Sequence, residues 1–343
     1  MPPRRITMQD IADACGLSRN TVSKVFNGRG SVPQATRTLV IQKAKELGYG
    51  SPAAETSGSP SPGGSIALLT RYLPRQLHYG TLFLSSFTDM ISRAGYSLKI
   101  YEVSPEELKA KQLPPHFVSE QTAGIVGIEL FDQEYLDMIC GLGVPFVLTD
   151  TPAEAISNLM KCDCVTMENI AGIMAIIKRL ADGGARRIGF VGDYNHCGSF
   201  RERWYGYHQG LLVNGLQFDE DFCICEPDSS PYDDSAWLLT RFDRMPSLPD
   251  AFVCANDYLA IPLLTALKKR GVSVPGDVMV TGFDGMPQSA FTDPPLTTVQ
   301  IHGTEIGRLA AELLLNRIRI PAFPYSWTRV KSTPIWREST RSV

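Results

Sequence analysis

Apolar residues near the start of the chain recur at helical spacing. The first predicted helix has an apolar face at positions i, i+3, i+4 and i+7, formed by Met8, Ile11, Ala12 and Cys15. Gly16 is typical of a residue that ends a helix, and Ser18 is placed to cap a second one. The pattern therefore predicts two short helices joined by a tight turn.

The second predicted helix has its apolar side at Val22, Val25 and Phe26. A third is predicted from about Pro33 to Leu47, because proline suits a first helical turn and Gly48 suits a stop. A short glycine-containing turn between two short helices is the signature of a helix-turn-helix, whose second helix can enter the DNA major groove. A generic three-helix bundle is the alternative interpretation.

From Ser65 onward, short apolar runs alternate with helical stretches. These runs predict strands at 66–69, 98–103, 124–128, 144–148, 188–191, 251–255 and 278–283. The alternation is typical of an α/β fold with a mostly parallel sheet. Each half of this region holds several such units, so we expect two doubly wound α/β lobes with a cleft between them.

These patterns divide the chain into three parts. Residues 1–49 form the predicted headpiece, and residues 50–64 are rich in Gly, Ser and Pro, which is typical of a flexible linker. Residues 65–343 form the two-lobed part. We expect lobe one at about 65–162 and 294–323, and lobe two at about 163–293 and 324–343. The chain would pass between the lobes near 162–166, 291–294 and 321–325.

Charge is spread unevenly over these parts. The first 50 residues hold eight basic and three acidic side chains, a net charge of +5, whereas the whole chain carries −3. A basic headpiece on an acidic body indicates that the headpiece meets a polyanion such as DNA. A solvated basic face is the other interpretation of the same charge.

The composition indicates neither a membrane protein nor a metalloprotein. We find no run of about 18 apolar residues, and the first ten residues lack the apolar core of a signal peptide, so we expect a cytoplasmic protein. The eight cysteines include two C-x-C pairs, Cys162 with Cys164 and Cys223 with Cys225, a spacing that zinc sites seldom use. We expect no metal, no cofactor and no structural disulfide.

A resemblance to a known family rests on the segment TMQDIADACGLSRNTVSKVFNGRGSVPQATRTLVIQKAKELGY, which is similar to the headpiece of the LacI/GalR family of bacterial repressors. Later phrases in the family's order and spacing are GARRIGFVG, SFRERWYGY, PDAFVCANDYLA, GVSVPGDVMVTGFDG and PPLTTVQ. Together they cover most of the chain. The resemblance implies a body like the periplasmic sugar-binding proteins, a homodimer, and double-stranded operator DNA read by two headpieces.

The family's base-reading positions correspond to Arg19, Asn20 and Lys24 on the second predicted helix. Arginine can bind guanine and asparagine can bind adenine through paired hydrogen bonds in the major groove. Phosphate contacts that fix the register are expected from Thr7, Ser18, Thr21, Ser23 and Asn27, with added charge from Arg29 and Arg37. Helix capping is an equally open role for Thr7 and Ser18.

The linker departs from the family pattern. The family places a short hinge helix with an N-x-x-A-R-x-L-like phrase after the headpiece, and its leucine wedges into the minor groove and kinks the DNA. Here the stretch SPAAETSGSPSPGG has neither arginine nor leucine, and its glycines and prolines oppose helix formation. We therefore expect the minor-groove wedge to be weaker, absent or replaced by another contact.

Ligand-binding residues are expected where the predicted parallel strands end. Asp150, Asn256 and Asp284 each follow a predicted strand, and Arg203 lies in SFRERWYGY after another. By resemblance these four match the family's effector-contacting positions, and Tyr79 matches an aromatic residue that packs on the ligand. Such polar groups can each hold two neighbouring hydroxyls, which favours a sugar or sugar derivative over a nucleobase. Weaker candidates are His78, Ser199 and Tyr232.

Several of these positions have structural interpretations as well. Asp257 is expected to cap a helix rather than contact a ligand. Arg203 could be a plain ion-pair partner, and Tyr232 could cover a loop. His196 and Cys197 resemble a catalytic pair, but no third group that would orient them is evident, so we expect no catalysis there.

Taken as a whole, these features predict a sequence-specific DNA-binding repressor whose operator affinity is controlled by a small molecule bound between two lobes. An enzyme is disfavoured because G-x-x-x-x-G-K-[ST], G-x-S-x-G and H-E-x-x-H are missing from the sequence. A pure solute receptor is disfavoured by the attached headpiece and by the absence of a signal-peptide pattern.

Overall fold

The computed structural model describes residues 7–27, 33, 36, 38–40, 43–44, 64–72, 79–156 and 161–342. The chain divides into two compact units, residues 1–60 and residues 61–343. Their boundary falls within the range predicted for the linker. The first unit is small and helical, and the second holds all of the described strands.

The first unit is built from short helices. α1 (Met8–Cys15) ends at Gly16, whose backbone φ of 64° is left-handed, and α2 (Arg19–Asn27) begins three residues later. Residues 36, 38–40 and 43–44 are helical, within the range predicted for the third helix. The buried core draws on all three segments: Ile11, Ala12, Val22, Val25, Val40 and Ala44. The predicted helix-turn-helix is confirmed, while residues 50–63 of the predicted linker (50–64) lie outside the described residues.

A six-stranded parallel sheet forms the centre of the first lobe of the second unit, in the order β10-β5-β4-β3-β1-β2. Its strands are β1 (Ser65–Thr70), β2 (Ser97–Glu102), β3 (Thr122–Ile128), β4 (Phe146–Leu148), β5 (Asp163–Met167) and β10 (Trp327–Val330). β1 and β4 are buried along their whole length, which is why their sequences read as nearly continuous apolar runs.

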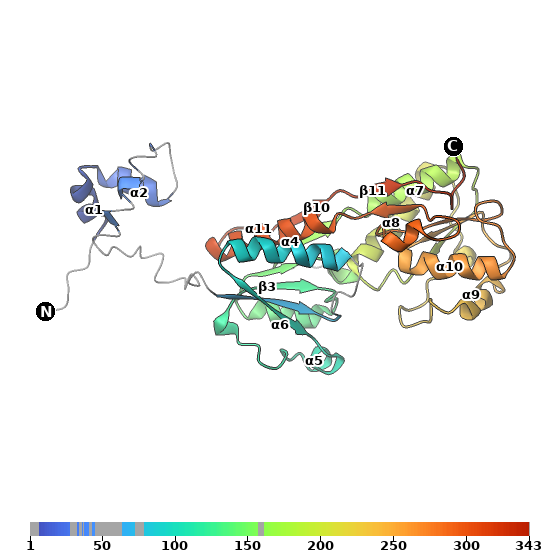
Figure 1. Ribbon diagram of the computed structural model, residues 1–343, viewed down its shortest axis with the longest axis horizontal. Helices are drawn as coiled ribbons and strands as arrows, with labels where there is room; N and C mark the ends of the chain where they lie inside the picture. Colours follow the sequence, from blue (N-terminus) through green and yellow to red (C-terminus); the bar gives the residue numbers. More distant parts are fainter. Residues whose placement is uncertain are drawn as a thin grey trace. The chain divides into compact units, whose positions relative to one another are not determined.

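Helices cover both faces of this sheet (Figure 1). α4 (Tyr79–Arg93) and α11 (Gly303–Arg319) pack together on one face, and α5 (Pro105–Ala110) and α6 (Gln133–Gly141) lie on the other. α4 and α11 approach closely because Gly307 has no side chain: a Cβ there would lie 2.4 Å from the carbonyl oxygen of Phe83. The 3-10 helices η1 (Ser119–Gln121) and η2 (Ala153–Ile156) precede β3 and follow β4.

The second lobe has a smaller sheet. β6 (Ile188–Val191), β7 (Ala251–Cys254) and β8 (Met279–Thr281) are parallel neighbours, and β9 (Thr298–Gln300) pairs antiparallel with β11 (Thr333–Ile335). Its helices are α7 (Ile170–Asp182), α8 (Gly198–Val213), α9 (Ser235–Phe242) and α10 (Asp257–Lys269), with 3-10 helices η3 (Glu220–Phe222) and η4 (Pro287–Ala290). The predicted α/β class with two lobes is confirmed.

The chain passes between the lobes three times, after β5, between β9 and α11, and between β10 and β11. These passages lie near residues 168–169, 301–302 and 331–332, a few residues beyond the predicted ones. The difference arises because β5 and β10 are strands of the first sheet, whereas β9 pairs with β11. The sequence patterns missed these four strands, since each has three to five residues and is interrupted by polar ones.

A buried ion pair ties α11 to β5. The Arg317 guanidinium donates to both carboxylate oxygens of Asp163, from Nε at 2.8 Å and from Nη2 at 3.0 Å. The Ser326 N–H also donates to Asp163, at 2.9 Å, and Arg317 donates to the carbonyls of Pro321 and Pro324. The Arg317 and Asp163 side chains are 6% and 2% exposed. The pair therefore fixes the connection from α11 to β10 at the edge of the sheet.

Within the described ranges, no helix is long and apolar enough to cross a membrane. The same ranges hold no group of three or more His, Cys, Asp or Glu side chains that could bind a metal ion. All eight cysteines lie in the described part of the chain and are free thiols.

Candidate functional site

α2 presents a polar face to solvent. Arg19, Asn20 and Lys24 are exposed, whereas Val22 and Val25 are buried. With 3.6 residues per turn, the three polar residues fall on one half of the helix and the two valines on the other. The predicted base-reading residues thus share one side of α2, and its apolar side holds the helix in the core.

Thr7 and Ser18 cap the two helices. The Thr7 hydroxyl accepts from the Asp10 N–H, and the Asp10 carboxylate accepts from the Thr7 N–H at 2.7 Å, which together form a capping box. The Ser18 hydroxyl accepts from the Thr21 N–H at 3.1 Å. Both capping residues are nevertheless exposed, and Thr21 and Ser23 are partly exposed. The Asn27 side chain and Arg29 lie outside the described residues.

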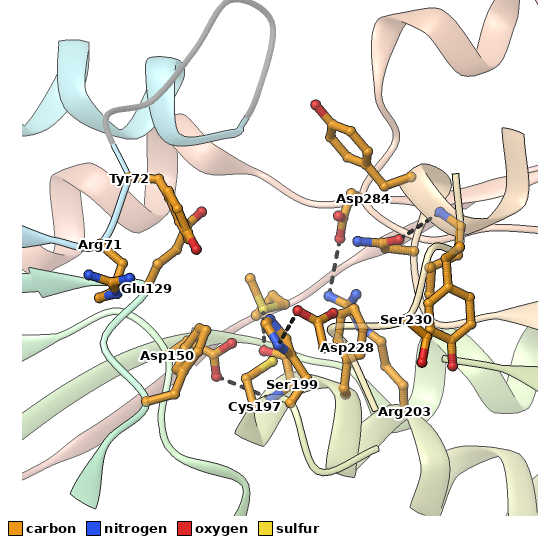
Figure 2. A pocket seen from close by; sticks show the side chains of 18 of the residues that line it. Arg71, Tyr72, Glu129, Asp150, Cys197, Ser199, Arg203, Asp228, Ser230 and Asp284 are labelled. Carbon is orange, nitrogen blue, oxygen red and sulfur yellow. Dashed lines mark hydrogen bonds and ion pairs between the residues drawn. The ribbon is translucent and has the colours of Figure 1, made fainter. Parts of the chain in front are cut away.

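A pocket of about 840 Å³ lies at the carboxyl ends of the strands of both lobes. The first lobe contributes residues that follow β1, β3 and β4, and the second contributes residues that follow β6, β7 and β8. Figure 2 shows Arg71, Tyr72 and Glu129 across the pocket from Arg203 and Ser230. The structure brings four of the five predicted effector residues together in its lining: Asp150, Arg203, Asn256 and Asp284. The side chain of the fifth, Tyr79, and the weaker candidate His78 lie outside the described residues.

Asp150 joins the end of β4 to the start of α8. One of its carboxylate oxygens accepts from the Thr151 N–H at 2.7 Å and from the Ser199 N–H at 3.1 Å. Only 7% of Asp150 is exposed, and burial raises its pKa above the ordinary value, against the opposing effect of the Thr151 N–H. The carboxylate therefore occupies the amino-terminal end of α8 on the pocket wall.

Arg203, on α8, is the most heavily engaged side chain of the pocket. Its Nη2 lies 3.1 Å from Asp284 Oδ1, its Nη1 donates to the Ala255 carbonyl at 2.7 Å, and its guanidinium lies 3.8 Å from the centre of the Phe283 ring. It is 2% exposed. Arg203 is thus an ion-pair partner, as one interpretation allowed, and it also lines the pocket.

Two pocket residues have unusual backbone geometry. Asp284 has a φ of 102° and Glu129 a φ of 54°, and they are two of the four non-glycine residues with positive φ in the described part of the chain. Such conformations cost about 1–3 kcal/mol and persist where the surrounding structure holds them, often at binding sites. Asp284 is held by its ion pair with Arg203 and by a bridge to Gln300.

The end of β7 corrects one expectation. Asn256, not Asp257, is the N-cap of α10, with its side-chain oxygen accepting from the Leu259 N–H at 3.0 Å. Asp257 is fully buried and accepts from the Thr298 hydroxyl at 2.6 Å and from the Met286 N–H at 2.7 Å. Burial raises the Asp257 pKa to about 7. Asp257 therefore joins α10, β9 and the loop after β8, and it does not line the pocket.

Two weaker candidates, Ser199 and Tyr232, do line the pocket. The Tyr232 ring is buried and its hydroxyl donates to the Glu226 carbonyl at 2.8 Å, so it also supports its loop. Ser199 is buried, and its N–H is the group that binds Asp150.

The sequence patterns missed an ion pair at the pocket. His196 Nδ1 lies 3.3 Å from Asp228 Oδ2, and the imidazole ring contacts Phe131 of the first lobe and Phe200 of the second, each with ring centres 5.1 Å apart. Burial lowers the pKa of His196, but the hydrogen bond and charge of Asp228 outweigh it, so the net pKa is raised. His196 follows β6 by five residues, so the strand-end rule could have found it.

A network of hydrogen bonds connects Arg203 to Asn169, Glu202 and Arg329. Asn169 Oδ1 accepts from Arg203 Nε at 3.0 Å, and Asn169 Nδ2 donates to Glu202 at 2.8 Å. The other Glu202 oxygen accepts from Arg329 of β10 at 2.6 Å. Asn169 and Arg329 lie at or beside two of the three passages between the lobes. The network therefore links the pocket wall to the segments that must bend if the lobes move.

The pair formed by His196 and Cys197 does not have the chemistry of a nucleophile and its base. Cys197 is buried, and burial together with the negative charge of Asp150 raises its thiol pKa well above the ordinary value. A thiol must ionise to attack a substrate. Asp228 orients His196, a partner that the sequence patterns did not indicate, but the raised pKa of the Cys197 thiol opposes its use as a nucleophile.

A helix-turn-helix unit joined to a two-lobed α/β unit with a pocket at its strand ends defines a class of ligand-controlled DNA-binding proteins. Residues 7–51 match the family described as bacterial regulatory proteins, lacI family, and residues 177–340 match the periplasmic binding protein-like domain. The chain therefore combines a lacI-family helix-turn-helix domain with a periplasmic binding protein-like domain, and it is a DNA-binding transcriptional regulator.

Similar proteins extend over nearly the whole chain. The HTH-type transcriptional repressor PurR of Haemophilus influenzae (strain PittEE) is 26% identical over 343 residues, covering 98% of this chain and 99% of the relative. A solved transcriptional regulator CelR–cellobiose complex has a TM-score of 0.69 and 26% identity, covering 98% of this chain and all of that one. The lac repressor dimer bound to operator and the anti-inducer ONPF has a TM-score of 0.70 at 22% identity, covering 99% and 100%, and supports the fold.

Proposed function

We propose that this regulator is a homodimer that binds operator DNA through α2 and is controlled by a polyhydroxylated small molecule in the interlobe pocket. The observation that carries the proposal is the combination of an exposed Arg19, Asn20 and Lys24 face with a strand-end pocket in the same chain. Residues 1–49 would be the DNA-binding part, and residues 65–343 the effector-binding and dimerisation part.

Base contacts would come from Arg19 and Asn20, because their paired donors and acceptors match guanine and adenine edges. Lys24 would add a base or phosphate contact. Thr7, Ser18, Thr21, Ser23, Asn27 and Arg29 would set the register on the phosphate backbone. Capping at Thr7 and Ser18 supports this role, since it fixes the helix ends that approach the DNA.

The ligand would contact Asp150, Arg203, Asn256 and Asp284, with Tyr79 as a further candidate. The similar CelR structure is a complex with cellobiose, which is consistent with a carbohydrate here. Closing the lobes around a ligand would bend the three connecting segments. The network from Arg203 through Asn169 to Arg329 supports coupling of the pocket to these segments. Allosteric coupling of this kind typically changes affinity about 5–150-fold.

The test uses the full chain and duplexes enriched from a random double-stranded DNA library. Fluorescence anisotropy measures DNA affinity with and without a panel of sugars, sugar phosphates and purines. We expect R19A to lose at least tenfold in affinity for the selected duplex, whereas K178A, which removes an exposed lysine of α7, should have no effect. Equal losses for both variants, or a DNA affinity that no bound ligand changes, would overturn the proposal.

A further inference from the structure

Both arginines of the pocket lining make contacts within the protein. Arg203 is occupied by Asp284, Asn169 and the Ala255 carbonyl. The other guanidinium of the lining, that of Arg71, donates to the Val103 carbonyl and lies over the Tyr72 ring. Arg203 is therefore neutralised by Asp284, whereas Arg71 is held by a neutral carbonyl at the wall of the first lobe and keeps its charge.

The helix ends at the pocket are occupied as well. A helix amino terminus is a ready anion-binding site because its first N–H groups have no partner within the helix. At α8 this position is taken, since the Ser199 N–H donates to Asp150 and the Gly198 N–H donates to the Thr151 carbonyl. At α10 the Asn256 side chain caps the Leu259 N–H. A phosphate would have to displace groups of the protein itself.

The lining is strongly acidic. Its positive groups are two guanidiniums and the His196 imidazole, against six carboxylates that come from both lobes: Glu129, Asp132, Asp150, Asp228, Asp233 and Asp284. Asp284 is engaged by Arg203 and Asp228 by His196, and the other carboxylates still outnumber the remaining positive group, Arg71. A second negative charge brought into this space would be repelled and would lose its own hydration.

Aromatic rings supply the apolar part of the lining. Tyr72 and Phe131 come from the first lobe, and Phe200, Tyr232 and Tyr258 come from the second. Carboxylates among aromatic rings suit a ligand that has many hydroxyl donors and apolar ring faces. They do not suit one that needs donors from the protein, as a phosphate or a carboxylate does.

Resting on the proposed function, we infer that the pocket selects carbohydrates without a negative charge, neutral sugars or amino sugars, and rejects sugar phosphates and sugar acids. The inference thus narrows the proposed effector from any polyhydroxylated small molecule to one that carries no negative charge. Amino sugars should bind at least as well as their neutral parents, since an ammonium group would face the same carboxylates.

The experiment measures binding of matched ligand sets to the full chain by calorimetry, alongside DNA affinity by anisotropy. The sets are ribose with ribose 5-phosphate, glucose with glucosamine, glucose 6-phosphate and glucuronate, and cellobiose with cellobionate, with hypoxanthine and guanine as non-carbohydrate probes. We expect at least one neutral sugar to bind, and its phosphorylated or acidic counterpart to bind at least tenfold more weakly. Tighter binding of an anion, or binding of the purines alone or of none of the probes, would overturn the inference.

Variants with altered charge test whether the pocket carboxylates cause the preference for uncharged sugars. The doubly neutralised variant E129Q/D233N should narrow the ratio of neutral to phosphorylated affinity at least threefold, because it removes two repelling charges. The matched control D182N neutralises an exposed carboxylate of α7 outside the pocket and should leave the ratio unchanged. An unchanged ratio in E129Q/D233N would contradict the electrostatic explanation.

The two readouts separate this inference from the proposed function. If a sugar phosphate binds more tightly than its neutral parent and shifts DNA affinity, the proposed function stands and the charge inference fails. If a neutral sugar binds but DNA affinity does not change, the charge inference stands and the proposed coupling fails.

Discussion

Replacing Arg203 tests how the pocket wall is held. In R203M the Asp284 carboxylate, whose side chain is 12% exposed, would lose its ion-pair partner, and the Ala255 carbonyl would lose a 2.7 Å hydrogen bond. Removing one member of a buried pair costs about 3–5 kcal/mol, because the remaining charge stays buried without compensation. Methionine fills much of the same volume, so the loss reports the polar contacts more than a cavity. We therefore expect R203M to lower the free energy of unfolding of the 61–343 unit by about 3–5 kcal/mol.

A double-mutant cycle separates the ion pair from its surroundings. D284N alone should cost less than R203M, because Arg203 keeps Asn169 and the Ala255 carbonyl. The double variant R203M/D284N should be more stable than the sum of the single changes predicts, by about 1–3 kcal/mol.

Urea unfolding followed by tryptophan fluorescence is a suitable assay. All four tryptophans belong to the 61–343 unit, and Trp204 adjoins Arg203 in the sequence. R203K should fall between the wild type and R203M, because lysine keeps the charge but not the planar fork. A cost below about 1 kcal/mol for R203M, or additivity within about 0.3 kcal/mol in the cycle, would refute the reasoning.

Three further changes have defined outcomes. D163A should destabilise the 61–343 unit by about 3–5 kcal/mol in urea unfolding, because its arginine partner stays buried, whereas D182A at an exposed pair should change stability by less than about 1 kcal/mol. Similar costs would contradict this. The raised pKa of Asp257, about 7, means that the folded protein binds more protons than the unfolded chain between about pH 4 and 7, so this residue makes stability fall as pH rises through that window and level off above it. D257N should flatten that fall, and an unchanged slope would rule the residue out as its cause. K24A should lower the slope of log affinity for DNA against log salt by about 0.9 if Lys24 contacts a phosphate, and an unchanged slope would exclude that contact.

Much of the fold could be predicted because local sequence determines it. β1 and β6 are nearly continuous apolar runs, and the apolar spacing of α1 ends at Gly16, which adopts the left-handed geometry that glycine allows. β10 could not be predicted in this way. Its residues pair with β5, where Trp327 lies opposite Cys164, so the strand depends on a partner far away in the sequence.

Some residues of the site could likewise be predicted from local sequence, and others could not. Asp150 and Asp284 could be found because they follow strands, and parallel strands end at one edge of a sheet. The role of Asn256 was assigned to Asp257 because the start of α10 is displaced by one residue, which sequence patterns rarely resolve. The network of Asn169, Glu202 and Arg329 joins three distant segments, and no local spacing indicates such a contact.

Because the chain crosses between the lobes three times, the order in which its parts are synthesised affects how it folds. Everything needed for the first unit lies within the first 60 residues, so that unit can fold while the ribosome is still working. The first lobe cannot complete its fold this early. Leu314 and Ile318 of α11 cover Gly124 of β3, and β10 pairs with the edge of β5, so both late segments must be synthesised first. The part of the sheet that α11 covers therefore stays exposed until almost the entire chain has been made. In the nascent protein, a helix-turn-helix unit whose residues are complete therefore precedes a first lobe that still lacks α11 and β10.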